Sequence, residues 1–120
     1  PFDVVVSQEV LEHAGDQRAY LAQAHSVLRE GGYLVLTTPN AAVSLSNPTL
    51  LMQPMENHLT RAELRRILTV ERYSVERLYS FFYGYAKWRP YRFQMRYGRL
   101  LNAGLHQIAV CRKVGGPLPL

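Results

Sequence analysis

The sequence predicts an α/β fold in which strands and helices alternate along the chain. Two short runs of aliphatic and β-branched residues, 3–6 and 33–38, have the composition of strands buried in a parallel sheet. Between them, residues 20–28 carry apolar side chains at the spacing of one helix face. A strand, a helix and a second strand in this order predict a βαβ unit with parallel strands.

The composition favours one small domain with a single core. The chain has 120 residues, of which 48% are hydrophobic. No apolar run approaches the length of a helix that spans a bilayer. Cys111 is the one cysteine, so an internal disulfide is excluded and a reducing, cytoplasmic location is expected. Because Pro1 stands directly before a predicted strand, we expect the chain to be a piece of a longer protein.

The two predicted strands should deliver polar residues to a common edge. The first, Asp3–Val6, is expected to be covered on both faces because its valines are consecutive rather than alternating with polar residues. It ends at the polar cluster Ser7–Glu9. The second strand, Tyr33–Thr38, is closed by Pro39-Asn40. In parallel sheets the carboxyl edge is where ligands bind.

The helix between these strands has a start signal and a stop signal. Asp16 can cap its first turn through a side-chain oxygen. Gly31-Gly32 is expected to stop the helix, since glycine readily adopts a positive φ. One apolar stripe lies between the two signals: Tyr20, Leu21, Ala24, Val27 and Leu28.

A second helix follows a long connection. Residues 41–59 show no clean period and read as an irregular excursion at the carboxyl end of the second strand. Thr60 and Glu63 then form a capping box, and Leu59 and Leu64 can pack across it. The apolar face of this helix consists of Leu64, Ile67 and Leu68.

The last third of the chain holds two more predicted strands, 73–79 and 105–111, and a tail at 114–120. All nine acidic residues lie before residue 77, whereas eight basic residues and no acid follow, so an anionic partner or a solvated basic face is expected there. Segment 79–99 contains nine of the thirteen aromatic residues. It reads either as packing or as a lid over an apolar acceptor with anionic groups. An anionic membrane surface is a further partner for it, and nucleic acid is ranked last.

Three pieces of the sequence, taken together, resemble class I S-adenosylmethionine-dependent methyltransferases. They are Phe2-Asp-Val-Val with Glu9-Val-Leu-Glu-His13, then Val27-Leu28-Arg-Glu-Gly31-Gly32, then Leu34-Val-Leu-Thr-Thr-Pro39-Asn40. The likeness is greatest to the branch that holds the ubiquinone-biosynthesis O-methyltransferases and the methyltransferases of glycan clusters. The stretch His58–Leu64 also resembles the segment that follows the fifth strand in those proteins.

The resemblance implies a partial Rossmann-like sheet, family strands four to seven, with helices on the faces and the last strand antiparallel beside the fifth. It assigns residues 1–113 to the C-terminal part of a methyltransferase domain, with 41–59 and 79–104 as substrate-side excursions. The family's glycine-rich loop and its ribose-binding acid are absent from these 120 residues. We therefore expect this piece alone to bind S-adenosylmethionine poorly and to be inactive.

The resemblance also implies site residues. Ser7, Gln8 and Glu9 are the candidates for holding the methionine end of the cofactor, where fixed polar groups orient the methyl group. Methylating a hydroxyl requires removal of its proton, and imidazole is well suited to this near neutral pH. His13 and His58 are therefore the candidate catalytic bases, and a structural role is the alternative for each.

Other residues have two readings. Asn40, Trp88 and Arg89 are candidate substrate-binding residues, although Asn40 equally suits a turn. His25 and His106 are expected to be structural or exposed, and Cys111 to be a small core residue. A divalent metal is not favoured, but one set resembles the metal ligands of small-RNA terminal 2′-O-methyltransferases. That set is Glu9, Glu12, His13 and His58.

These observations predict methyl transfer from S-adenosylmethionine to an oxygen, less favourably a nitrogen, of a small-molecule, lipid or glycan acceptor. Two alternatives remain open. One is a metal-dependent RNA 2′-O-methyltransferase. The other is a non-catalytic α/β remnant that forms a homodimer through an open sheet edge.

Overall fold

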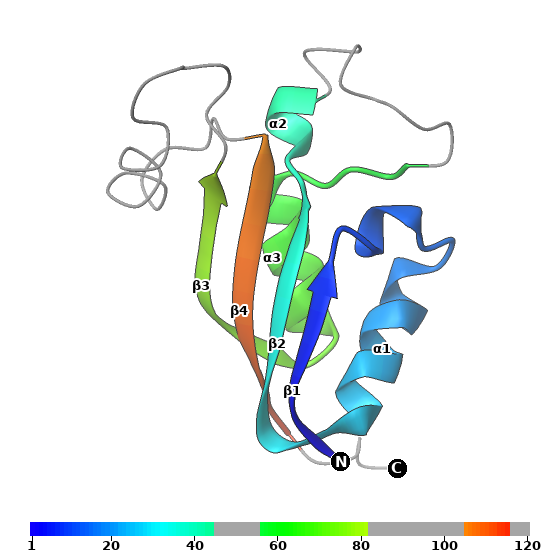
Figure 1. Cartoon of the computed structure of the whole chain (residues 1–120), viewed down its shortest axis with the longest axis vertical. Helices are drawn as coiled ribbons and strands as arrows, with labels where there is room; N and C mark the ends of the chain where they lie inside the picture. The colour runs from blue at the N-terminus through cyan, green and yellow to red at the C-terminus, as the bar shows by residue number, and fades with distance from the viewer. Residues whose placement is uncertain (45–55, 82–104, 116–120) are drawn as a thin grey trace.

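The computed structural model describes residues 1–44, 56–81 and 105–115, which form a four-stranded mixed sheet with its long helices on one side (Figure 1). The strands are β1 (Phe2–Gln8), β2 (Leu28–Pro39), β3 (Tyr73–Phe81) and β4 (His106–Lys113). The helices are the 3-10 turn η1 (Leu11–His13), α1 (Gln17–Val27), α2 (Ala41–Ser44) and α3 (Arg61–Val70).

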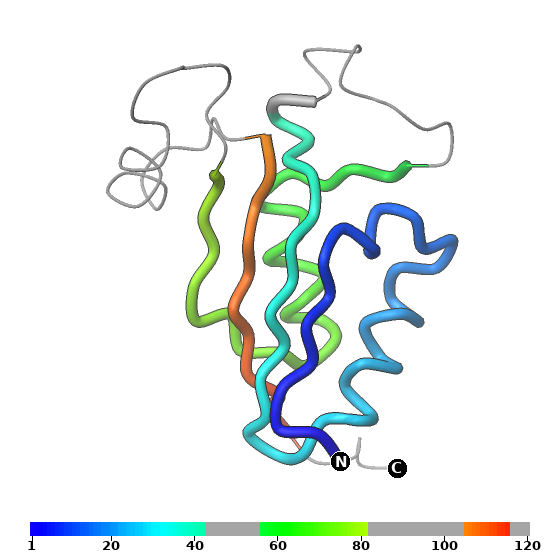
Figure 2. Tube along the Cα trace, in the orientation of Figure 1, coloured from blue at the N-terminus to red at the C-terminus, as the bar shows by residue number. Residues whose placement is uncertain are grey.

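The strand order is β1-β2-β4-β3. β1 and β2 are parallel and are joined through α1, so the predicted βαβ unit is confirmed (Figure 2). β4 lies between β2 and β3 and runs antiparallel to both, which confirms the antiparallel last strand. As a result, the first residues of β4 lie at the same edge as the last residues of β2, with His106 opposite Pro39.

The core lies between the sheet and the two long helices. Alternate residues of β2 and β4 point to this side and are fully buried, which is the period of two expected of a strand. α1 contributes Leu21, and α3 contributes the predicted pair Leu64 and Leu68. The buried strand residues are Leu34, Leu36, Ala109 and Cys111.

The opposite face of the sheet has no helix over it among the described residues (Figure 1). Along β1, Phe2, Val4 and Val6 are 62%, 50% and 69% exposed. The expectation that Asp3–Val6 is covered on both faces is therefore wrong for the described part of the chain. A run of valines has a high strand propensity wherever it lies, but its burial requires a second covering layer.

The connection between α1 and β2 differs from the prediction. The Asp16 cap is confirmed, because Oδ1 accepts the N–H of Ala19 at 3.0 Å. However, α1 ends at Val27 and Leu28 is already extended, so Gly31-Gly32 does not stop the helix. The glycines lie inside β2, where its pairing with β1 is irregular.

Close packing explains the second of these glycines. A Cβ on Gly32 would lie 2.9 Å from the carbonyl oxygen of Arg29 and 3.1 Å from that of Asp3. Gly31 has a φ of +72°, which also favours glycine. The earlier helix end also leaves Val27 42% exposed, so the apolar stripe is wrong at that position.

The start of α3 is confirmed in detail. Thr60 Oγ1 accepts the N–H of Glu63 at 3.2 Å, and Glu63 Oε1 accepts the N–H of Thr60 at 2.9 Å. Leu59 and Leu64 are both buried on either side of this capping box. Leu59 also accepts the N–H of Ala41 at 3.0 Å, which ties the segment before α3 to the end of β2.

Replacing Thr60 with alanine should lower the free energy of unfolding by about 1 kcal/mol, because the N–H of Glu63 loses its acceptor. Thr69→Ala is the matched control in the same helix. Thr69 Oγ1 only donates to the carbonyl of Arg65, at 2.8 Å, so its loss leaves no backbone donor unsatisfied. Chemical denaturation of both variants measures the difference, and equal losses would contradict a capping role for Thr60.

Candidate active site

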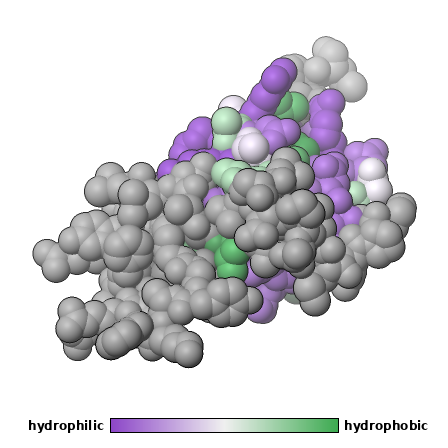
Figure 3. All heavy atoms as spheres, turned by 90° about the horizontal axis from the view of Figure 1, so that it is seen from above, coloured by the Kyte–Doolittle hydropathy of each residue, from purple (hydrophilic) through white to green (hydrophobic). Residues whose placement is uncertain are grey.

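Polar side chains gather where β1 and β2 end. The N–H of Glu9, just after β1, donates to the carbonyl of Thr37 on β2 at 2.9 Å. η1 follows on one side, and residues 56–59 return to the same edge. Seen from this end, the described residues present a largely hydrophilic surface with a few apolar residues between them (Figure 3). The predicted meeting of polar groups at one edge is therefore observed.

Glu9 has a positive φ, and its side chain contacts a residue of β4. Its φ is +53°, a left-handed conformation that costs about 1–3 kcal/mol for a residue other than glycine. Its Oε1 lies 2.7 Å from Nδ1 of His106 at the start of β4. The ring of His106 stacks on Phe81, with centroids 5.7 Å apart. The side chain of Glu9 therefore spans β2 and joins three strands at the site edge.

The other two candidates for cofactor binding, Ser7 and Gln8, are the last residues of β1, and their side chains face different directions. Ser7 is buried, and its Oγ lies 2.6 Å from the hydroxyl of Tyr20 on α1, so its side chain faces the helix layer. Gln8 is exposed and lies opposite Thr37. Two buried oxygens at this edge, Glu9 Oε2 and Thr37 Oγ1, have no hydrogen-bond partner among the described residues. Thr37 was not a sequence candidate, since its type and its place in a strand are ordinary.

The structure brings the two candidate bases together through a third residue. His58 Nε2 lies 2.9 Å from Glu56 Oε2. His13 Nε2 lies 3.8 Å from Glu56 Oε1 and 3.6 Å from Glu12 Oε1. Glu56 was not predicted, because nothing local distinguishes it from a solvated carboxylate in an irregular segment.

Backbone hydrogen bonds hold this cluster against η1. The N–H of Asn57 donates to the carbonyl of Glu12 at 2.7 Å. The side-chain amide of Gln17 donates to the carbonyl of Asn57 at 3.0 Å and to that of Leu11 at 3.2 Å. Gln17 is itself buried, and its side chain links α1 to η1 and to the segment that carries Glu56.

Glu12 is a buried acid within this cluster. It is 2% exposed, and its Oε2 accepts the hydroxyl of Thr38 at 2.9 Å. Desolvation by burial raises the pKa of Glu12 above its usual value, and the hydrogen bond from Thr38 opposes that rise only in part. The Glu12 carboxyl therefore retains its proton to a higher pH than a solvated glutamate does.

The four residues of the metal alternative are not gathered around one point. Glu9 pairs with His106, whereas His13 and His58 pair with Glu56, and Glu12 lies beside His13. Within residues 1–44, 56–81 and 105–115, no group of three or more His, Cys, Asp or Glu side chains is arranged to hold a metal ion.

The remaining candidates have structural contacts or lie elsewhere. Asn40 is buried, and its Oδ1 accepts the N–H of Ala42 at 3.2 Å, as a turn residue does. Trp88 and Arg89 lie outside the described residues. His25 packs edge-on against Tyr73, with centroids 5.4 Å apart, which fits its expected structural role.

Cys111 is a core residue, as predicted. It is fully buried, and burial raises the pKa of its thiol to about 12. A thiol with so high a pKa is a poor nucleophile near neutral pH.

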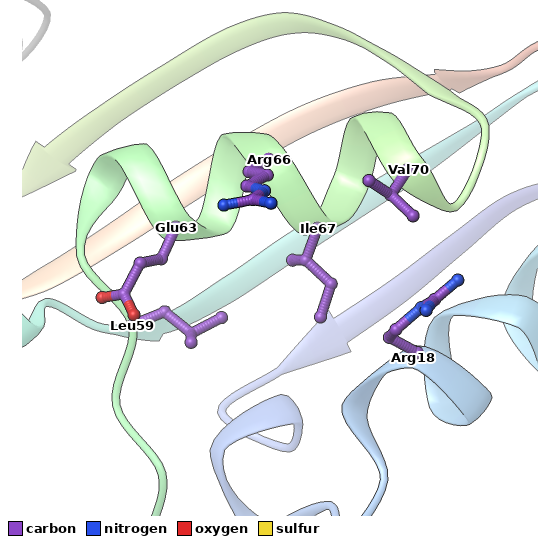
Figure 4. Close-up of a pocket in the computed structure, with 6 residues that line it drawn as sticks. All are labelled: Arg18, Leu59, Glu63, Arg66, Ile67 and Val70. Atoms are coloured by element: carbon purple, nitrogen blue, oxygen red, sulfur yellow. The ribbon is translucent and has the colours of Figure 1, made fainter.

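A pocket of about 370 Å³ lies between α1 and α3 (Figure 4). Its lining includes the apolar side chains of Leu59 and Ile67 and the basic side chains of Arg18 and Arg66. Arg18 is already paired with Glu71 at 2.6 Å. None of the candidate site residues lines this pocket, and Leu59 is the residue that it shares with the segment returning to the polar edge.

Comparison with known proteins adds an independent finding. Residues 1–83 match the family described as "Methyltransferase domain". A stretch of 83 residues is 32% identical to a Mycolicibacterium smegmatis protein named "Probable S-adenosylmethionine-dependent methyltransferase", covering 68% of this chain and 32% of that protein. A stretch of 39 residues is 46% identical to the ubiquinone biosynthesis O-methyltransferase of Cereibacter sphaeroides, covering 32% of this chain and 16% of that protein.

The fold is similar to solved structures as well. A Thermotoga maritima S-adenosylmethionine-dependent methyltransferase superposes with a TM-score of 0.72 at 13% identity, over 94% of this chain and 56% of that one. At that identity the likeness concerns the fold alone. The chain spans about one third of the length of the Mycolicibacterium relative that it matches, since the matched stretch covers 32% of that protein.

Glu12→Gln should remove part of the pH dependence of stability. Since the pKa of Glu12 in the folded protein lies above its ordinary value of 4.5, the folded state keeps a proton that the unfolded state releases. The contribution of Glu12 to the free energy of unfolding therefore falls as pH rises from about 4.5 through the folded-state pKa. Denaturation at a series of pH values should show this fall in the original protein and not in the variant.

Glu63→Gln is the contrasting control. The hydrogen bonds of the capping box lower the pKa of Glu63, so its contribution is lost as pH falls through the folded-state pKa, below 4.5. The two variants should thus alter the pH dependence of stability on opposite sides of pH 4.5, Glu12→Gln above it and Glu63→Gln below it. An unchanged profile for Glu12→Gln would contradict the burial of a proton-retaining carboxyl.

Proposed function

The chain belongs to the methyltransferase domain family, and on this premise we propose that the protein transfers a methyl group from S-adenosylmethionine to an acceptor oxygen. The proposed acceptor is a small molecule, a lipid or a glycan, and nitrogen is the less favoured target. The observation that carries the proposal is the polar edge at the ends of β1 and β2, where Glu9 and Thr37 each keep a buried oxygen without a hydrogen-bond partner among the described residues.

These oxygens suit the methionine end of the cofactor. An unsatisfied buried acceptor costs about 1–3 kcal/mol, and an ammonium donor would remove that cost. We propose that Ser7, Gln8 and Glu9 bind this end of the cofactor. Ser7 would do so through its backbone, because its side chain faces the helix layer, whereas Gln8 and Glu9 would use their side chains. The bound cofactor supplies a methyl group on a positively charged sulfur, while the chain supplies orientation and charge.

The proton chemistry is assigned to the cluster beside η1. A hydroxyl that attacks a methyl group must lose its proton, and His13 and His58 are the proposed acceptors for it. Asn40, at the end of β2, is proposed to orient the acceptor, together with Trp88 and Arg89 from outside the described residues. The 120 residues contain no glycine-rich cofactor loop, so we expect this chain by itself to bind the cofactor weakly and to lack activity.

The proposed surroundings follow from the charge distribution. Segment 79–99 is basic and aromatic, which suits an anionic acceptor or an anionic membrane surface. Nucleic acid is ranked last because no sequence signature of an RNA-binding module accompanies the segment. We propose a cytoplasmic protein with peripheral membrane contact. In the part of the chain that the structure describes, no helix has the length and apolar character needed to cross a membrane.

A second candidate is a non-catalytic homodimer. It is favoured by one observation, the exposed apolar row Phe2, Val4 and Val6 on the outermost strand of the described sheet. β1 also presents its outer backbone edge, since it is the outermost strand of the described sheet, and such an edge can pair with a strand of a second chain.

Calorimetry with S-adenosylmethionine on the intact protein tests the main proposal. Glu9→Ala should weaken binding about 10- to 100-fold, the value of one hydrogen bond to a charged group. Glu76→Ala is the control, because Glu76 pairs with Arg112 at 3.3 Å on the sheet, away from the edge. Absence of binding by the intact protein, with a dimer on size exclusion, would instead support the non-catalytic remnant.

Exhaustive chelation separates the main proposal from the metal-dependent RNA methyltransferase. Methyl transfer by the intact protein should persist in excess EDTA, because Glu9 is held by His106 rather than beside Glu12. Loss of activity that Mn²⁺ or Mg²⁺ restores would contradict this expectation and would favour the metal-dependent alternative.

A further inference from the structure

Glu56 joins the two histidines that the sequence singled out. One of its carboxylate oxygens lies 2.9 Å from Nε2 of His58, and the other lies 3.8 Å from Nε2 of His13. The first distance is that of a hydrogen bond, whereas the second is that of an ion pair. A single carboxylate therefore faces the Nε2 atom of each of the two imidazole rings.

The position of Glu56 is imposed by its neighbours in the chain. Asn57 is anchored on both backbone groups, by the carbonyl of Glu12 at 2.7 Å and by the side chain of Gln17 at 3.0 Å. Leu59 is anchored by the N–H of Ala41 and by the buried amide of Gln107, which donates to its carbonyl at 2.8 Å. Glu56 thus extends from a fixed backbone.

The two histidines differ in access. The side chain of His13 is 38% exposed, whereas that of His58 is 2% exposed and that of Glu56 is 11% exposed. A base must touch the hydroxyl that it deprotonates. His13 meets this condition in the described structure, and His58 is placed instead to orient Glu56.

We propose that Glu56 is a positioning residue for His13, held in place by His58, and that His13 is the base for methyl transfer. This inference rests on the proposed function and separates two roles that the sequence left equivalent. The Glu56 carboxylate lies 3.8 Å from Nε2 of His13, beyond hydrogen-bond distance, but its charge favours the proton on that nitrogen and leaves the lone pair on Nδ1.

The step balances within these groups. The acceptor O–H bond breaks and its proton moves to Nδ1 of His13 as the oxygen attacks. The new O–CH₃ bond forms while the S–CH₃ bond breaks, and the sulfur keeps that electron pair. The His13 ring becomes positively charged, and the carboxylate of Glu56 lies within ion-pair distance of it, 3.8 Å from Nε2. Solvent then removes the proton from the exposed ring.

The test compares Glu56→Gln, Glu56→Asp and Glu30→Gln in the intact protein. Glu56→Gln should lower kcat about 10- to 100-fold, the usual effect of losing an orienting partner, with little change in the KM for S-adenosylmethionine. Glu56→Asp keeps a carboxylate in the cluster and should retain more of kcat than Glu56→Gln does.

Glu30→Gln is the matched control for removal of one carboxylate. The side chain of Glu30 is 66% exposed and lies 3.9 Å from Lys113, at the opposite end of the sheet from the cluster. Its kcat should equal that of the original protein. An equal effect of Glu30→Gln and Glu56→Gln would reduce the result to a change in net charge and would overturn the inference.

Nitrogen-15 spectra of the imidazoles make the outcome independent of turnover. In the original protein His13 and His58 should carry the neutral-ring proton on Nε2, and Glu56→Gln should mix the tautomers of both, with His25 unchanged as an internal reference. If methyl transfer occurs but Glu56→Gln alters neither kcat nor the tautomers, the positioning role is overturned and the proposed function stands. If no acceptor is methylated, the proposed function fails, and unaltered tautomers would also overturn the contact.

Discussion

The site depends on how β4 enters the sheet. Because β4 lies between β2 and β3 and runs antiparallel to both, its first residues reach the edge at which β1 and β2 end. His106 can therefore meet Glu9, and Gln107 can donate to the carbonyl of Leu59 at 2.8 Å. Without this insertion, the Glu9 side chain would lose its partner on β4, and the carbonyl of Leu59 would keep only its bond from Ala41.

A second constraint is the satisfaction of buried polar groups around η1. The side chain of Gln17 and the carbonyl of Glu12 both bind Asn57, so the return of the chain to this edge is held by hydrogen bonds rather than by apolar packing alone. Leaving such groups unpaired would cost about 1–3 kcal/mol each. The same bonds that stabilise the fold therefore set the position of Glu56 and His58.

Patterns of short range predicted the local structure well. The Asp16 cap, the Thr60 capping box and the parallel βαβ unit all depend on residues close in sequence, and all are observed. The prediction that Gly31-Gly32 stops the helix was wrong, because a glycine pair suits a helix end and a strand irregularity equally. The burial of β1 was misjudged because a valine run specifies a strand, whereas its cover depends on elements elsewhere in the protein.

The sequence by itself determined the fold class, the likeness to methyltransferases and the candidate groups Glu9, His13 and His58, because each is encoded in a motif of a few adjacent residues. Only the tertiary structure decided which of these groups meet. It placed Glu9 on His106 and put Glu56 between the two histidines. These partners are distant or unremarkable in sequence, and their pairing follows from strand order and from backbone hydrogen bonds between segments that no local pattern records.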